Sequence, residues 1–419
     1  MRRRFLRLTS SFVLIPALLL SVPSAEDQAL AAEKKTVIYA GYRTLSSSLP
    51  AERLMLRMGV WYPAKRRPGV VKIADWNFRA ARNAPVMEGM WPVIVLSHDV
   101  TGDAWAHHEI AAALARRGFI VAAPTHDYDN ADDMRLLFSD RELPLRAVQV
   151  RSALDVVLEN EYLRPKVDKE RIGFLGFGLT APSGFLLAGA VLSPKGWSDF
   201  IQEQKADNKG SARKSPWFQP YLAQRMEQLV RRMEHRAEER RQKADMMQSA
   251  LASRELFFQR LDSSLERSHR RILRQNREME LPQPPVILPL LPPLSHDRAV
   301  TDERFKALAL VSPGFSMLFS PDSFAQVQKP VLIIGAGRDS LLLPGEQAER
   351  FAAMLPFRPD YKLFAEATAS MFQNTRGDDI SRTLFGITAD KEDPAQRVLL
   401  REQLLNTLQD FFHRSFGIK

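Results

Sequence analysis

The chain contains no cysteine among its 419 residues. It can therefore form no disulfide, and it offers no thiolate nucleophile, no cysteine-ligated metal site and no cysteine for a lipid anchor. Its stability must come from packing, and with 45% hydrophobic residues a chain of this length can bury a large core. Length alone permits either one enlarged domain or two to three domains.

Long hydrophobic runs are scarce as well, and only the start of the chain carries a candidate. An apolar stretch at positions 12–21 follows arginines at positions 2, 3, 4 and 7 and precedes small residues, an order typical of a signal peptide. The stretch is interrupted by Pro16 and is shorter than the roughly 20 residues of a membrane-spanning helix. We therefore predict a signal peptide at residues 1–31 and no permanent membrane span after its cleavage. Residues 29–31 fit the cleavage site, and residues 22–24 are an earlier alternative.

The amino-terminal arginines leave the export route open. The run Arg2–Arg7 resembles a twin-arginine signal and equally fits the basic start of an ordinary Sec signal. Cleavage after Ala31 removes four arginines and two acidic residues, so the formal charge falls from +10 to +8. We expect a periplasmic or secreted protein, and an exported location excludes nucleic acid as its partner.

Short β-rich runs alternate with helical patterns over residues 36–193, which predicts βαβ units around a mostly parallel sheet with helices on both faces. The same pattern resumes over residues 300–419. The predicted strands are 54–62, 93–96, 119–123, 171–176, 305–311, 331–335 and 361–364, and the predicted helices are 109–117, 145–158, 347–354 and 394–416. Together the two segments are predicted to form one α/β core.

Residues 194–299 break this pattern and are predicted to form a helical insertion. Apolar residues recur at helical spacing in two series, Leu222 to Met233 and Leu251 to Ile272, which indicates a helical hairpin or lid. A proline-rich tether follows at residues 281–293. Residues 205–280 hold 18 basic and 11 acidic side chains. Such a surface is usually solvated, and it can also contact an unknown protein or lipid ligand.

Three stretches of the first core segment carry a family resemblance. The runs 59–64 (Gly-Val-Trp-Tyr-Pro-Ala), 92–98 (Pro-Val-Ile-Val-Leu-Ser-His) and 121–126 (Val-Ala-Ala-Pro-Thr-His) resemble the α/β-hydrolases, in the branch of platelet-activating factor acetylhydrolases and predicted dienelactone hydrolases. In that family the next strand enters a Gly-His-Ser-x-Gly-Gly elbow, which presents the catalytic serine. Here residues 176–181 read Gly-Phe-Gly-Leu-Thr-Ala, so Gly178 stands at the nucleophile position.

The resemblance also places the other members of the triad. Asp339, after strand 331–335, matches the catalytic acid, and Ala369 stands where the family carries the histidine base. Asp99 follows the strand that precedes the oxyanion site, where an inward carboxylate would repel a developing oxyanion. These changes predict a pseudo-hydrolase that binds or scaffolds, with Asp339 reduced to capping a turn. The residues expected to line its binding site are His98, Asp99, Phe177, Gly178, Leu179 and His126.

Two alternatives keep an enzyme. A carboxylic-ester or lipid hydrolase could use a relocated nucleophile, for which Thr180 and Ser183 are the candidates. Hydrolysis could instead depend on a metal, because histidines and carboxylates follow two neighbouring strands; these are His98, Asp99, Asp103, His107, His108, His126 and Asp127. Their spacing matches no known metal motif. The simpler reading, which we adopt, makes His98 and His126 structural, leaves His107 and His108 in a solvated helix start, and requires neither metal nor cofactor.

Overall fold

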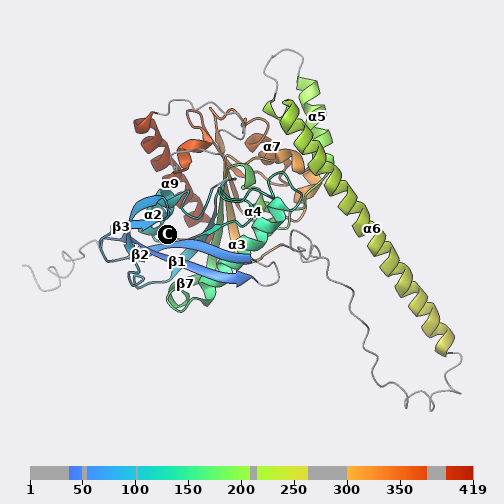
Figure 1. Ribbon diagram of the computed structural model, residues 1–419, viewed down its shortest axis with the longest axis horizontal. Coiled ribbons are helices and arrows are strands. Elements are labelled where there is room, and N and C mark those ends of the chain that lie inside the picture. The colour runs from blue at the N-terminus through green and yellow to red at the C-terminus, as the bar shows by residue number, and fades with distance from the viewer. Residues whose placement is uncertain are drawn as a thin grey trace, which may run out of the picture. The chain divides into compact units, whose positions relative to one another are not determined.

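The computed structural model describes residues 37–49, 54–100, 102–207, 215–262, 300–374 and 393–418. The signal peptide and the proline-rich tether lie outside these residues, so both stay predictions. In the described part of the chain ten strands form one sheet, in the order β10-β9-β8-β7-β5-β6-β2-β1-β4-β3 (Figure 1). The strands are β1 (Tyr39–Leu49), β2 (Leu54–Ala64), β3 (Gly69–Ile73), β4 (Trp76–Arg82), β5 (Trp91–Ser97), β6 (Ile120–Thr125), β7 (Val167–Phe177), β8 (Phe305–Val311), β9 (Val331–Ala336) and β10 (Asp360–Phe364).

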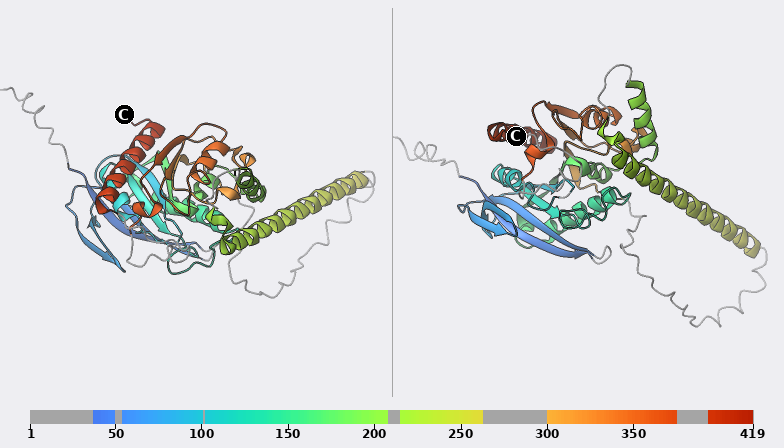
Figure 2. Two further views of the ribbon diagram at one scale, coloured as in Figure 1. Left: turned by 90° about the horizontal axis from the view of Figure 1, so that it is seen from above. Right: turned by 45° about the horizontal axis from the view of Figure 1, so that its top comes forward.

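Helices cover both faces of this sheet (Figures 1 and 2). Apolar residues of α2 (His108–Arg116) and α9 (Pro394–Phe416) share one core cluster with the sheet, and those of α3 (Glu142–Glu159), α4 (Ser183–Leu187) and α7 (Ala348–Met354) share the other. Strands β5 to β10 pair in parallel, whereas β2 pairs antiparallel with both β1 and β6. The fold is therefore the α/β-hydrolase-like, mostly parallel architecture that the sequence predicted.

The central strands form because their sequences are continuous apolar runs. All six residues of β6 and all six of β9 are buried, as a strand covered by helices on both faces requires. β1 and the edge hairpin of β3 and β4 were not predicted, because residues on their two faces differ in exposure and their sequences mix polar with apolar residues.

The insertion separates two strands that are neighbours in the sheet. β7 ends before the insertion and β8 begins after it, and the two pair in parallel, with Phe174 opposite Leu308. The core segments on the two sides of the insertion therefore complete one sheet, which positions the carboxyl ends of β5, β7 and β9 at a common edge.

The insertion begins with α5 (Lys195–Asp207) and continues as α6 (Pro220–Asp262), a helix of 43 residues. The predicted hairpin is wrong over this range, because the series from Leu222 and the start of the series from Leu251 lie on one continuous helix (Figure 2). The remainder of the second series, beyond Asp262, lies outside the described residues. Leu222, Met226, Leu229 and Met233 are buried, as their spacing predicted.

Arginines anchor the first part of α6 to the loop after β6. Arg225 and Arg232 donate to the carbonyl oxygens of Leu137 (3.2 Å) and Phe138 (2.6 Å), and Arg236 pairs with Asp140 at 2.7 Å. These three basic side chains bind the core, whereas Glu227, Arg231 and His235 in the same part of α6 are exposed. From Ala237 onward, every α6 residue whose side chain is described is exposed.

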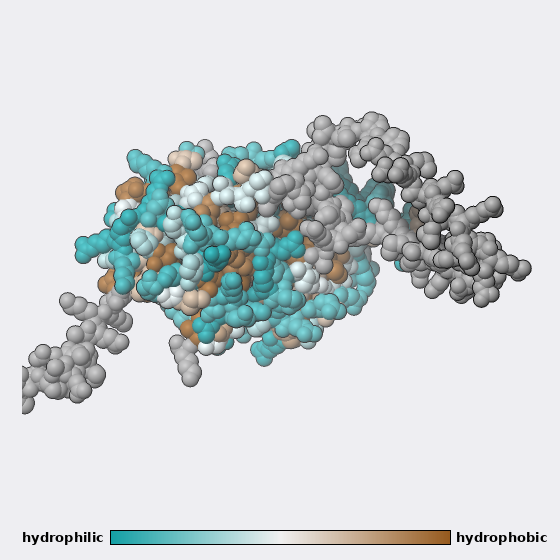
Figure 3. Space-filling view, turned by 90° about the horizontal axis from the view of Figure 1, so that it is seen from below, coloured by the Kyte–Doolittle hydropathy of each residue, from teal (hydrophilic) through white to brown (hydrophobic). Residues whose placement is uncertain are grey.

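None of the helices in the described ranges combines the length and the apolar character of a membrane span. On the face drawn in Figure 3, hydrophobic residues form patches that are interrupted by hydrophilic ones.

Candidate functional site

The elbow at the end of β7 keeps the backbone geometry of a nucleophile elbow. Gly178 follows the strand directly, has a φ of 64°, and opens the short 3-10 helix η2 (Gly178–Thr180). In α/β-hydrolases this turn holds the nucleophile in a strained conformation above the sheet. A glycine adopts the same left-handed conformation without a Cβ clash. The turn is present, and it carries no side chain at its apex.

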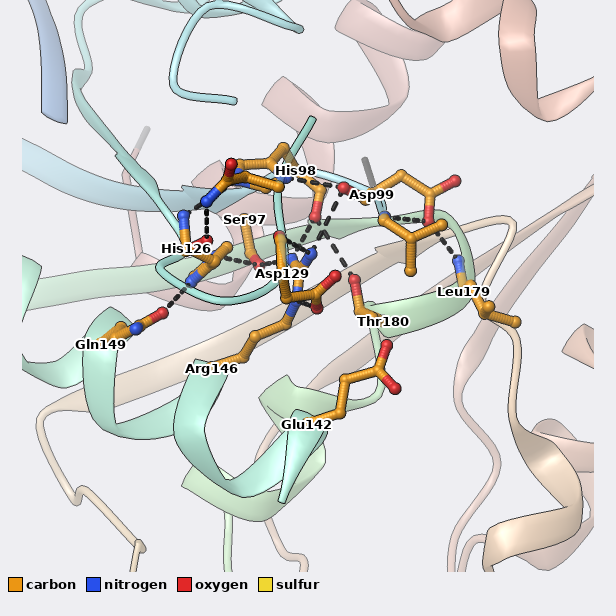
Figure 4. Close-up of polar contacts among 12 residues, drawn as sticks. Ser97, His98, Asp99, His126, Asp129, Glu142, Arg146, Gln149, Leu179 and Thr180 are labelled. Carbon is orange, nitrogen blue, oxygen red and sulfur yellow. Dashed lines mark hydrogen bonds and ion pairs between the residues drawn. The ribbon is translucent and has the colours of Figure 1, made fainter. Parts of the chain in front are cut away.

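The carboxyl group of Asp99 occupies the space that a side chain at position 178 would need. A Cβ placed on Gly178 would lie less than 3.0 Å from three atoms of the Asp99 carboxyl group, which real Cβ atoms essentially never do. Oδ1 of Asp99 accepts hydrogen bonds from the backbone N–H of Val100 and of Leu179, both at 2.7 Å (Figure 4). Asp99 therefore points into the elbow.

Those two amides hold the positions of an oxyanion hole. One belongs to the residue after the nucleophile position and the other to the loop after the neighbouring strand β5, which is where α/β-hydrolases place their two donors. A carboxylate oxygen of the chain itself thus accepts the hydrogen bonds that a tetrahedral intermediate would accept. Burial raises the pKa of the Asp99 carboxyl to about 7, although its bonds to Val100 and Leu179 and the charge of Arg146 oppose that rise.

Arg146 of α3 fixes the loop that carries Asp99. Its side chain is 1% exposed, and its guanidinium donates to the backbone carbonyls of His98 and Asp99 and to the Ser97 hydroxyl (Figure 4). The same guanidinium forms an ion pair with the buried carboxylate of Asp129. One buried cation therefore holds three consecutive residues at the end of β5.

A second buried carboxyl group lies in this network. Glu142 is 2% exposed and accepts a hydrogen bond from the Phe138 N–H at 2.8 Å. Burial, followed by the charge of Asp129, raises the pKa of Glu142 well above its usual value. This rise favours the protonated form of Glu142, while Arg146 pairs with the Asp129 carboxylate.

His98 and His126 are held by hydrogen bonds inside the core. His98 donates through Nδ1 to the Asp99 carbonyl at 2.6 Å and accepts the His126 N–H at Nε2, at 3.1 Å. His126 contacts Gln149 through Nδ1 (2.9 Å) and Ser97 through Nε2 (2.8 Å). Both rings have all their hydrogen-bonding positions filled, and burial keeps their pKa values well below the usual value.

His107 and His108 are buried, so the prediction of a solvated helix start is wrong. His107 stacks on Phe177 with ring centroids 3.8 Å apart and donates through Nδ1 to the Phe372 carbonyl. His108 stacks on Phe78 at 5.0 Å. Burial lowers the pKa of His107 to about 3 and that of His108 to about 4. Both rings are neutral, and they lie in the core between α2 and the sheet.

Asp339 and Ala369 lie together, as the family pattern places acid and base. Oδ1 of Asp339 accepts the N–H groups of Leu341 and Leu342, and Oδ2 accepts the N–H of Ala369 at 2.9 Å. Ala369 begins the short 3-10 helix η7 (Ala369–Phe372). The carboxylate therefore caps two backbone segments, which is the turn-capping role that the sequence predicted for it.

The candidate replacement nucleophiles have no base beside them. The Thr180 hydroxyl donates to the His98 carbonyl at 3.4 Å, and the Ser183 hydroxyl is buried without a hydrogen-bond partner.

Among the residues expected to line a binding site, Phe177 and Leu179 are buried, as are both histidines. Asp99 alone of the six keeps some exposed surface together with a charged group.

A metal centre finds no support in the loops after β5 and β6. In the ranges that the structure describes, no three histidine or carboxylate side chains are grouped so that they could hold a metal ion. His107 and His108 lie at the start of α2. His98 and His126 bond to each other, and His126 also contacts Gln149 of α3. The histidine-rich sequence is thus divided between the two faces of the sheet.

Comparisons with known proteins give a distant structural match. No protein-family model matches the chain, and no curated protein sequence matches it. Among solved structures the chain is similar to a ferulic acid esterase from Streptomyces cinnamoneus, with 15% identity, 91% of each chain covered and a TM-score of 0.49. At that identity and score the match carries no argument about activity.

Sequence reasoning missed Arg146, Asp129 and Gln149. The signal that could have found two of them lies in the predicted helix 145–158, where Arg146 and Gln149 fall on the stripe formed by Ala147, Val150 and Ala153. A charged residue on a buried helix stripe indicates a paired, structural role. Asp129 lies in a loop and carried no such signal.

Proposed function

We propose that this chain is a pseudo-hydrolase, an α/β-hydrolase-like protein that has lost serine-hydrolase catalysis and acts by binding or scaffolding. The observation that carries the proposal is the Asp99 carboxylate, whose Oδ1 accepts the Val100 and Leu179 amides beside a glycine at the nucleophile position. Acyl transfer needs an attacking side chain and a free oxyanion hole. Here the apex has no side chain, and an internal carboxylate holds the hole.

The proposed setting is the periplasm or the extracellular space, as the amino-terminal sequence predicts. The proposal keeps the chain in the branch that contains platelet-activating factor acetylhydrolases and predicted dienelactone hydrolases, as a member with a degenerate triad. The proposed partner is an unknown protein or lipid ligand, which the basic sequence of residues 205–280 would contact.

An ester or lipid hydrolase with a relocated nucleophile is the alternative. The hydrogen bond between Asp339 and the Ala369 backbone favours this alternative, because Asp339 then lies where the family has its catalytic acid. What opposes it is the environment of Thr180 and Ser183, whose hydroxyl groups have no imidazole partner.

The test is a measurement of turnover and covalent labelling on the purified chain. We expect no hydrolysis of p-nitrophenyl esters above the buffer rate from acetyl to palmitoyl chains, and no labelling by a fluorophosphonate probe. Turnover that is abolished by Thr180→Ala or Ser183→Ala would establish the alternative instead. Asp322→Asn is a matched control, because this exposed residue lies in a different 3-10 helix, Pro321–Phe324.

A further inference from the structure

The donors at the elbow form a small site of their own. The N–H groups of Val100 and Leu179 come from segments about 80 residues apart and converge on one oxygen atom, Oδ1 of Asp99. Val100 and Leu179 are 2% and 1% exposed. A buried N–H without an acceptor costs about 1–3 kcal/mol, so an acceptor must be present at this point. Asp99, in the loop after β5, supplies that acceptor.

The acceptor is an anionic oxygen, which defines the chemistry of the site. Two amides directed at one point bind a carboxylate or phosphate oxygen as readily as they bind the oxyanion of a reaction. Asp99 is half-buried as a residue, whereas Val100 and Leu179 are fully buried. The backbone beneath it is fixed independently, because Arg146 binds the carbonyl oxygens of His98 and Asp99. A rotation of the Asp99 side chain would therefore leave both amides in place.

We propose that the Val100 and Leu179 amides are an anion-binding site that Asp99 closes, and that the carboxylate or phosphate oxygen of a ligand takes its place when the side chain turns away. This inference rests on the proposed function, since it assigns the amides to ligand binding rather than to catalysis. It names the ligand class as an oxyanion.

The charges around Asp99 make the closure depend on pH. Arg146 of α3 favours the ionised form, whereas Asp129 after β6 opposes it, and burial opposes it most. Burial raises the pKa of Glu142 of α3 well above its usual value and lowers that of His98 well below its own. The elbow residues Gly178, Leu179 and Thr180 carry no charge. An ionised carboxylate is the stronger acceptor. The site is thus closed above the Asp99 pKa of about 7 and opens as the pH falls below it.

The experiment follows the two amides by NMR in the full mature chain, labelled with nitrogen-15 at valine and leucine. Val100→Ile and Leu179→Met identify the two resonances. We expect both to titrate together near pH 7, as the shared acceptor requires. Inorganic phosphate and acetate, added separately at about pH 5.5 and about pH 8, should shift both resonances at the lower pH and neither at the higher.

Variants of Asp99 test whether its side chain controls anion binding at the two amides. Asp99→Asn cannot ionise, and Asp99→Ala removes the internal acceptor, so in each the anion should shift the Leu179 resonance at both pH values. Asp339→Asn is the matched control, because its carboxylate also accepts backbone amides, at Leu341, Leu342 and Ala369, and it should leave the two resonances unchanged. A response to phosphate alone, or to acetate alone, would support the site and name its ligand group.

Two different results would overturn two different statements. If neither anion shifts the two amides in the wild type or in either folded Asp99 variant, the anion site is wrong while the pseudo-hydrolase proposal stands. Ester turnover by the same wild-type sample would refute the pseudo-hydrolase proposal, whatever the amides show.

Discussion

The two halves of the candidate site differ in how far they depart from the arrangement of a working hydrolase. The half at the ends of β9 and β10 keeps its arrangement, because Asp339 still bonds to the backbone at the base position and only the side chain of Ala369 falls short. The half at β5 and β7 has been rebuilt, since Asp99 fills the elbow and accepts both oxyanion donors. Relative to the family pattern, the first half lacks the side chain of the base, and the second carries an additional carboxyl group. Ala369→His, which restores the first half alone, should therefore recover no hydrolase activity.

The largest expected effect comes from reversing both halves. Gly178→Ser with Ala369→His should be labelled only slowly by a fluorophosphonate, because the Asp99 carboxyl group competes with the new serine for the space at the elbow. Adding Asp99→Gly should raise the labelling rate by about 100-fold, the value of a working oxyanion hole. Mass spectrometry of the adduct checks the result. Equal labelling of the double and triple variants, both folded by circular dichroism, would break the comparison between the two halves.

The rebuilt half should also depend on its buried cation. Arg146→Met leaves the Asp129 carboxylate buried and unpaired, which we expect to lower the free energy of unfolding by about 3–5 kcal/mol in urea titration. Arg135→Met removes a partner of similar geometry from the exposed Asp133 and should cost less than about 1 kcal/mol. Similar losses in the two variants would mean that Arg146 does not hold the loop.

The contact between Gly178 and Asp99 can be measured directly by a double-mutant cycle. Gly178→Ala should cost about 2–4 kcal/mol, because the left-handed backbone and the overlap with Asp99 both oppose a Cβ. In an Asp99→Gly background only the backbone contribution, about 1–2 kcal/mol, should remain. Gly69→Ala is the control, since nothing lies within 4 Å of its added Cβ. Equal costs in the two backgrounds would show that Asp99 does not occupy this space.

The smallest effect concerns the preserved half, where His107 holds the base loop through Phe372. Burial lowers the His107 pKa to about 3. The unfolded state therefore takes up a proton as the pH falls below about 6.5, and the folded state does not, so stability is lost towards acid by about 2 kcal/mol at pH 5. His107→Asn keeps a donor for Phe372 and should remove that loss from the pH profile of urea unfolding. His235→Asn, on an exposed part of α6, should leave the profile unchanged.

The sequence predicted what depends on spacing along the chain. Gly178 and Ala369 were located from the residues around them, and the central strands followed from continuous apolar runs. The bond from Leu179 to Asp99 could not be predicted, because it joins positions 80 residues apart through the direction of one side chain. The burial of His107 was missed for the same reason: its stacking partner, Phe177, comes from a different strand.

The continuous α6 was missed for a different reason. Two apolar series separated by a polar stretch fit a hairpin and a single long helix equally well, since helical spacing carries no information about where a helix ends. The stretch between Met233 and Leu251 holds no proline and no glycine, and this was the available sign that the helix continues.

The overlap between Asp99 and any side chain at position 178 also fixes an order of events. A serine at the elbow and this Asp99 conformation cannot coexist, because they claim the same volume. In a lineage that began with a serine, the serine had to disappear before the carboxylate could settle on the two amides. To regain a serine at position 178, such a lineage would first have to lose the Asp99 carboxyl group from the elbow. A single mutation to serine at position 178 would meet an occupied site, so under the proposed function the loss of the nucleophile would be hard to reverse in one step.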